Sequence, residues 1–204
     1  MYKIMLIIAL IFFSGCNSKT PTKSTMIKAS DNSSMKQLKN DLDAYTQATI
    51  DNDIPKLINF IYPKVFTVVP KTKMTQVLTE AYKSGNAPKV TNIKHLNINP
   101  IETYKEGMFS IITSSMSTTL KSPMPDNVKF EAYMLERIKK GLNGKGTVEF
   151  DKDQHTFAIK HVSKTLAINE NNRWKFAGIK QARKYAKKGL LAKALIDAIQ
   201  KEKN

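Results

Sequence analysis

The chain has 204 residues, with 33 basic and 17 acidic side chains and a formal net charge of +16. This length predicts one domain with short appendages, and the single cysteine excludes an intramolecular disulfide. The charge favours acidic partners such as anionic lipid, nucleic acid or acidic polymers, although a solvated lysine-rich surface explains it more simply. Only three of the basic residues are arginine. This disfavours nucleic acid, because bidentate base and phosphate contacts favour arginine.

The first residues have the pattern of an export signal. Lys3 gives a positive start, and residues 4–13 form an apolar run that is too short to span a bilayer but suits a signal peptide. The run ends in residues 13–16, with the sequence FSGC, which resembles the bacterial lipobox. This resemblance implies that residues 1–15 are a signal peptide that is removed. It also implies that Cys16 carries acyl chains, such as palmitate, that anchor the protein to a membrane.

Two alternatives remain for this segment: an ordinary secretory signal, and a buried terminal strand with a chance cysteine. If Cys16 is lipidated, the protein belongs to the bacterial cell envelope. In enterobacteria an aspartate after the cysteine favours the inner membrane; Asn17 and Ser18 stand there instead, which favours the outer membrane where both exist. Residues 16–34 are rich in Ser, Thr, Asn and Lys and are interpreted as a lipidated flexible tether.

Helical patterns dominate the next segment. Apolar residues at helical spacing predict an amphipathic helix over 34–52, and Asp53 is expected to cap a second helix that ends at Tyr62, before a proline. Residues 65–69 are predicted to form a short strand, and residues 71–84 a third helix that Gly85 ends.

From residue 88 the apolar period changes to two. Strands are predicted over 88–98, 101–106, 109–121, 144–151, 155–169 and 173–179, with a basic helix over 128–142. In residues 155–169, Phe157 and Ile159 are odd-numbered whereas Leu166 and Ile168 are even-numbered. A regular strand cannot bury both sets on one face, so a β-bulge is predicted near residues 161–163.

The last segment, residues 180–204, is predicted to be one basic helix with an alanine-leucine stripe. Lys184, Lys187 and Lys188 are its candidate binding residues, suited to anionic lipid or to a partner helix. The alternative is that this helix closes the core of the protein's own domain.

Two short motifs resemble the nuclear transport factor two-like (ketosteroid isomerase-like) superfamily. They are Ala44-Tyr45 followed by the acidic opening of a short helix at 51–57, and the polar turn and strand at 172–176, with the sequence NRWKF. The resemblance covers residues 35–179. It implies an α+β fold in which a curved antiparallel sheet packs on N-terminal helices as a cystatin-like cone, here with extra basic helices. This fold hosts isomerases, dehydratases and binding modules.

An enzyme of this kind needs an ionisable base deep in the cone. Glu102, Tyr104 and Glu106 alternate and are the candidates, although the same alternation fits a solvent-facing strand. Three further residues, Asp151, Asp153 and His155, could ligate a divalent metal, but a solvated hairpin turn is the favoured interpretation.

Two histidines on strands, His95 and His161, are interpreted as structural. No nucleophile motif, phosphate loop or zinc-ligand cysteine set is found, so no catalytic residue, metal or cofactor is assigned. The sequence predicts a non-catalytic envelope lipoprotein that binds a ligand or an envelope protein partner. The alternatives are an isomerase- or dehydratase-like enzyme that uses a cone cavity, and an electrostatic binder of anionic lipid or polymer through the C-terminal helix.

Overall fold

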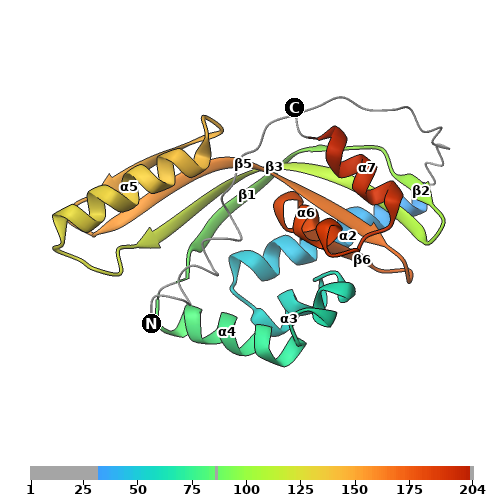
Figure 1. Ribbon diagram of the computed structural model, residues 1–204, viewed down its shortest axis with the longest axis horizontal. Helices are drawn as coiled ribbons and strands as arrows, with labels where there is room; N and C mark the ends of the chain where they lie inside the picture. Colours follow the sequence, from blue (N-terminus) through green and yellow to red (C-terminus); the bar gives the residue numbers. More distant parts are fainter. Residues whose placement is uncertain (1–31, 86, 203–204) are drawn as a thin grey trace.

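The computed structural model describes residues 32–85 and 87–202. The predicted signal peptide, Cys16 and the tether up to residue 31 lie outside these residues. The described chain forms an α+β fold with a six-stranded antiparallel sheet, as the sequence predicts (Figure 1). None of its helices combines the length and the hydropathy that crossing a bilayer requires.

The N-terminal part is helical, close to expectation. Helix α2 spans Asn32–Ile50, α3 spans Ile54–Asn59 and α4 spans Lys71–Lys83. Asp53 caps α3, its Oδ1 accepting the backbone N–H of Lys56 at 3.0 Å. The strand expected at residues 65–69 is wrong, because Pro63–Thr67 is a 3-10 helix, η1. Its proline favours helical backbone angles, and Val65 is buried by packing on the core, without strand pairing.

The sheet contains a strand in each of the six ranges that the sequence predicts. Its strands are β1 (Lys89–Ile98), β2 (Glu102–Tyr104), β3 (Gly107–Lys121), β4 (Gly146–Asp151), β5 (Thr156–Asn169) and β6 (Trp174–Gly178). The strand order is β1-β3-β5-β4, with β2 beside β3 and β6 beside β5. The long central strands β3 and β5 pair without a register shift from residues 108 and 169 to residues 121 and 156.

This continuous register corrects the expected bulge at residues 161–163. Phe157 and Ile159 lie in a cluster under helix α5 (Val128–Leu142), whereas Leu166 and Ile168 contact the C-terminal helices. The two sets lie on opposite faces of one regular strand, because different helices cover opposite faces at its two ends. The register shifts that do occur in this region are in β1, between residues 90 and 92 and between residues 95 and 97.

The alternation defines two faces of the sheet. Helices α2 and α5 cover one face, which we call the α2–α5 face. Ile112 and Leu120 are both even-numbered on β3 and therefore share a face. Ile112 packs in the cluster that contains α2, and Leu120 packs in the cluster that contains α5. Ile111 and Leu166 point to the other face, the α6–α7 face, where α6 (Ile179–Lys187) and α7 (Lys193–Lys201) pack.

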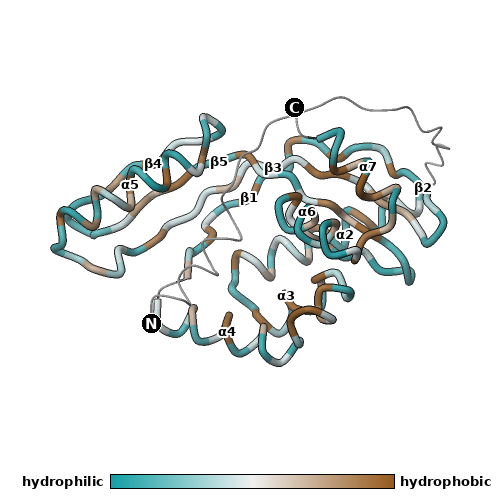
Figure 2. Tube along the Cα trace, in the orientation of Figure 1, coloured by the Kyte–Doolittle hydropathy of each residue, from teal (hydrophilic) through white to brown (hydrophobic). Residues whose placement is uncertain are grey.

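The molecule has a body and an arm. The arm consists of α5, β4 and the paired ends of β3 and β5, residues 116–121 and 156–161, and it extends to the left in Figure 1. Figure 2 shows apolar stretches both in the arm beside α5 and in the body around α7. The arm therefore has its own small core, centred on Phe157.

The predicted single C-terminal helix is two helices. Gly189, with a φ of +70°, separates α6 from α7. The break folds α7 back so that Leu191, Leu195 and Ile199 enter the body core. The alternative interpretation given for this segment, closure of the protein's own core, is therefore confirmed for its apolar stripe.

Candidate functional site

The interior where a cone cavity was sought is occupied by side chains. On the α6–α7 face Leu195 and Ile199 are 0% exposed and pack in one cluster with Leu166 and Ile168. On the α2–α5 face of the body, Leu38, Trp174 and Phe176 belong to a second apolar cluster. The one charged side chain that is fully buried among the described residues, Glu131, lies in the arm. Within the described residues of the body, the nearest equivalent is Glu102, which is half-buried and whose Oε2 atom is buried without a hydrogen-bond partner.

A carboxylate at the rim of the body gathers three side chains. The Oε1 atom of Glu170 accepts hydrogen bonds from the hydroxyls of Tyr62, at 2.8 Å, and Tyr104, at 2.7 Å. The ammonium of Lys64 lies 3.5 Å from the same oxygen. Glu170 follows β5, Tyr104 ends β2 and Tyr62 follows α3, so the bonds join three segments. Glu102 is half-buried and Glu106 is exposed, and the Tyr104 hydroxyl donates to Glu170 and not to either of them, so the expected trio is not joined by hydrogen bonds.

Both phenols are held in the neutral form. Burial, and next the hydrogen bond to Glu170, raise the pKa of Tyr62 and of Tyr104 above the usual range. At neutral pH both hydroxyls therefore remain hydrogen-bond donors, and both donate to the carboxylate of Glu170. This arrangement ties the β5–β6 turn to the body. Sequence reasoning noted Tyr104 but missed Glu170, because the partners are 66 residues apart in the chain.

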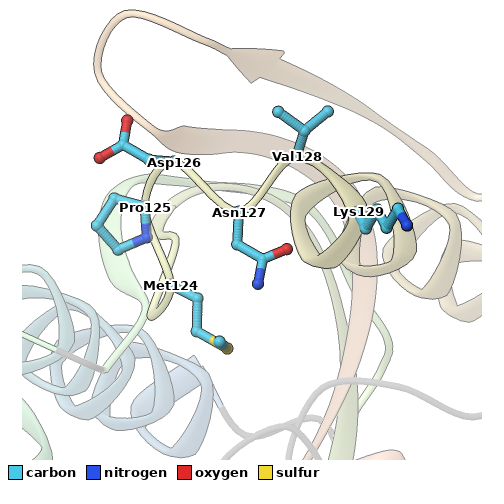
Figure 3. A pocket seen from close by; sticks show the side chains of 6 residues that line it. All are labelled: Met124, Pro125, Asp126, Asn127, Val128 and Lys129. Atoms are coloured by element: carbon cyan, nitrogen blue, oxygen red, sulfur yellow. The ribbon is translucent and has the colours of Figure 1, made fainter.

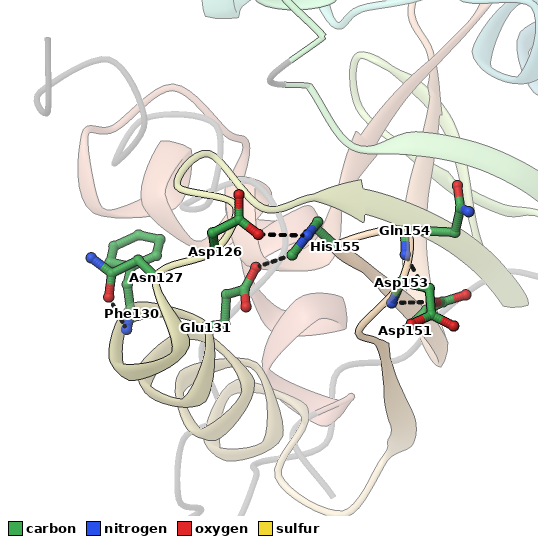
Figure 4. A network of polar contacts seen from close by, with 8 residues as sticks. All are labelled: Asp126, Asn127, Phe130, Glu131, Asp151, Asp153, Gln154 and His155. Carbon is green, nitrogen blue, oxygen red and sulfur yellow. Dashed lines mark hydrogen bonds and ion pairs between the residues drawn. The ribbon is translucent and has the colours of Figure 1, made fainter.

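A second polar network lies in the arm (Figure 4). His155 pairs through Nδ1 with the Oε1 atom of Glu131, at 2.9 Å, and through Nε2 with Asp126, at 3.2 Å. The Glu131 side chain is 6% exposed whereas that of Asp126 is 88% exposed. The buried pair orients the imidazole, and the exposed pair adds little stability. The network joins the start of α5 to the β4–β5 turn.

The predicted metal-ligand trio is not assembled. Asp151 instead holds its own turn, its Oδ1 accepting the backbone N–H groups of Asp153 and Gln154, each at 3.0 Å. His155 is directed toward Glu131 (Figure 4). No group of three His, Cys, Asp or Glu side chains in the part of the chain that the structure describes could hold a metal ion. The favoured interpretation of this segment as a polar turn is confirmed.

An open hollow of about 570 Å³ lies at the start of α5, lined by residues 124–129 (Figure 3). Its lining includes Met124 and Val128 beside the polar Asp126 and Asn127. The Asn127 side chain accepts the backbone N–H of Phe130 at 3.0 Å and caps α5, so it is already engaged. The hollow is a shallow surface feature without an acid-base pair of its own.

The strand histidines have structural surroundings. His95 lies between the hydroxyls of Thr46 and Ser114, at 3.0 and 2.9 Å, and burial lowers its pKa while Asp43 partly opposes this. Burial, and next Lys180, lower the pKa of His161. The contacts of His95 favour a structural role for it.

The candidate binding lysines of the C-terminal segment lie at the surface. Lys184, Lys187 and Lys188 are exposed at and just after the end of α6, on a helix whose Ile179 and Ala182 are buried. Their role in binding stays a prediction. Cys16 lies outside the described residues, so its lipidation also stays a prediction.

The fold and these contacts define an α+β protein with helices on both faces of an antiparallel sheet. No protein-family model matches the sequence, and no curated protein is significantly similar to it. Among solved structures, a candidate dehydratase of the NTF2-like family from Streptomyces avermitilis is similar. The TM-score is 0.38 and the identity 9%, covering 72% of this chain and 93% of that chain.

Proposed function

We propose that this protein is a bacterial envelope lipoprotein, anchored through Cys16, whose nuclear transport factor two-like domain is a non-catalytic binding module. The main support is the filled body core. A catalytic cone needs a cavity with a base in it, and on the sheet face that α2 covers the buried side chains of Leu38, Trp174 and Phe176 fill that space. The Glu170 carboxylate is engaged by Tyr62 and Tyr104 in a contact that ties segments together.

Surface charge sets the kind of partner. With a net charge of +16 over its 204 residues, the chain attracts acidic polymers and anionic surfaces. The exposed Lys184, Lys187 and Lys188 belong to this proposal as contacts to anionic lipid near the anchor. Asn17 and Ser18, which stand where enterobacterial inner-membrane lipoproteins have an aspartate, favour the outer membrane where the organism has two membranes.

Substitution of the acylated cysteine tests the anchor. In the Cys16→Ser variant we expect unprocessed precursor and a shift of the protein from the membrane fraction to the soluble fraction, because the thiol that takes up the lipid is absent. Palmitate incorporation and membrane fractionation measure this. The Ser18→Ala variant is the matched control and should be processed normally. Unchanged processing and fractionation of Cys16→Ser would show that the protein is not a lipoprotein.

A further inference from the structure

We propose that the uncovered part of the α6–α7 sheet face binds a linear phosphate polymer of the envelope. This inference names the partner of the binding module and therefore rests on the proposed function. We call this surface the open sheet face. It comprises Lys89, Asn92 and Lys94 of β1, Thr113, Ser115, Ser117 and Thr119 of β3, and Ala158, Lys160, Val162 and Lys164 of β5.

The strand register places these residues side by side. Across the three strands, Ser117 pairs with Asn92 on one side and Lys160 on the other. The next row along the sheet joins Lys94, Ser115 and Val162. Directly paired residues share a face of the sheet, so hydroxyls form a central line that lysines flank on both sides.

The face is uncovered in the described structure. Lys89, Lys94 and Lys160 are exposed, and the β3 hydroxyl residues between them are partly exposed. A central strand paired on both sides usually carries apolar residues on any face that another layer covers. Here β3 has apolar residues on this face only at Phe109 and Ile111, under α6 and α7, and changes to Ser and Thr beyond them.

The lysines of the open sheet face exceed the acidic groups around it. Lys164 pairs with Glu202 at the end of α7, and Glu149 on β4 lies beside Ala158. Lys89, Lys94 and Lys160 have no ion pair within the described residues. Three ammonium groups around a line of hydroxyls supply hydrogen-bond donors and positive charge together, which suits phosphate oxygens.

The dimensions and composition select the kind of anion. Residues 113–119 of β3 extend about 20 Å at the usual rise of a strand, which is longer than one small anion and suits a chain of charges. The face has no aromatic side chain among its residues, and nucleic-acid bases on such a platform are held by aromatic stacking. Its large apolar residue Val162 is exposed, as is Leu96 next to Asn97 on β1, and two separate side chains give little to insert into a bilayer.

Two matched charge variants test the assignment. The lipidated full-length protein is titrated in detergent micelles with linear polyphosphate, and the dissociation constant is measured at several salt concentrations. In Lys94→Gln/Lys160→Gln we expect binding to weaken about tenfold or more and the salt dependence to flatten, because phosphate contacts are lost. The control, Lys129→Gln/Lys140→Gln, removes the same charge from two exposed positions of α5 on the opposite face of the sheet, and it should stay within about threefold of the parent. Thermal unfolding of both variants verifies that they are folded.

Each of these titration outcomes would overturn the inference: no binding of polyphosphate, an equal or larger loss in the α5 control, or much tighter binding of single-stranded DNA of matched charge. Vesicles containing anionic lipid form a comparison arm with the unlipidated chain, and loss of vesicle binding in Lys94→Gln/Lys160→Gln without loss of polymer binding would also overturn it. These outcomes leave the Cys16-dependent anchoring intact. Failure of this inference is therefore distinguishable from failure of the proposed function.

Discussion

Glu170 and Glu131 show how single residues organise the polar part of this molecule. Each carboxylate joins segments distant in the chain, Glu170 through Tyr62 and Tyr104 and Glu131 through His155. Each is partly or wholly withdrawn from solvent, where a hydrogen bond to a charged group is stronger than at the surface. These two carboxylates therefore hold together segments that are distant in the chain.

His95 makes the stability depend on pH. Burial lowers the pKa of its imidazole below about 6.5, the value of the unfolded chain. As the pH falls through this range the unfolded state binds more protons, so stability is present above about pH 6.5 and is lost as the pH falls through the folded pKa. We expect the free energy of unfolding of His95→Asn to change less than that of the parent between about pH 7.5 and 5. Urea titrations at each pH measure this, and an unchanged slope would contradict it.

The long pair β3–β5 is the element on which the rest is arranged. It runs from the body to the end of the arm in one register. The arm end is covered by α5 on one face, whereas the body end is covered by α2 on that face and by α6 and α7 on the other. Where β2 turns into β3, the backbone of Gly107 lies against the end of β5. A Cβ at this position would lie 2.0 Å from the carbonyl oxygen of Asn169. Only glycine permits this approach of two backbones.

Gly107→Ala should therefore destabilise the sheet edge. The atoms in the way belong to the backbone, so relief requires strands to move, and we expect a loss of about 3 kcal/mol in the free energy of unfolding. Gly178→Ala is the control, because nothing lies within 4 Å of a Cβ there, and it should change stability by less than about 1 kcal/mol. Chemical denaturation of both variants compares them. Equal stabilities would mean that the strands accommodate the methyl group.

The whole molecule has separate apolar cores in the body and in the arm. The body core joins Leu195 and Leu166, and the arm core joins Phe157, Ile138 and Leu142. Shared strands connect the two cores, and the open sheet face lies along this connection. Because each region has its own core, we expect each to open as a cooperative unit.

Core truncations should separate the two units. Phe157 is 0% exposed, and Phe157→Ala should cost about 3–5 kcal/mol and speed hydrogen exchange in α5 and β4 while α2 and α6 keep their protection. Leu195→Ala should cost about 2–5 kcal/mol and act on α6 and α7 instead. Hydrogen exchange followed by mass spectrometry resolves the regions. Uniform loss of protection in either variant would show a single cooperative unit.

Much of the local structure was predictable from the sequence, because periodicity and caps act within a few residues. The helix at 128–142, the strand at 155–169 and the Asp53 cap are all signalled by neighbouring residues. The FSGC segment predicts the envelope location in the same local way, and this stays a prediction.

Tertiary structure decided which surfaces are buried. The parity change in residues 157–168 indicated a bulge, and only the placement of α5 and α7 on opposite faces shows that the strand is regular. Likewise Glu170, Glu131 and the rows of the open sheet face depend on partners far away in the chain. Such contacts leave no periodic trace in a single sequence, because their spacing is set by how the chain returns on itself.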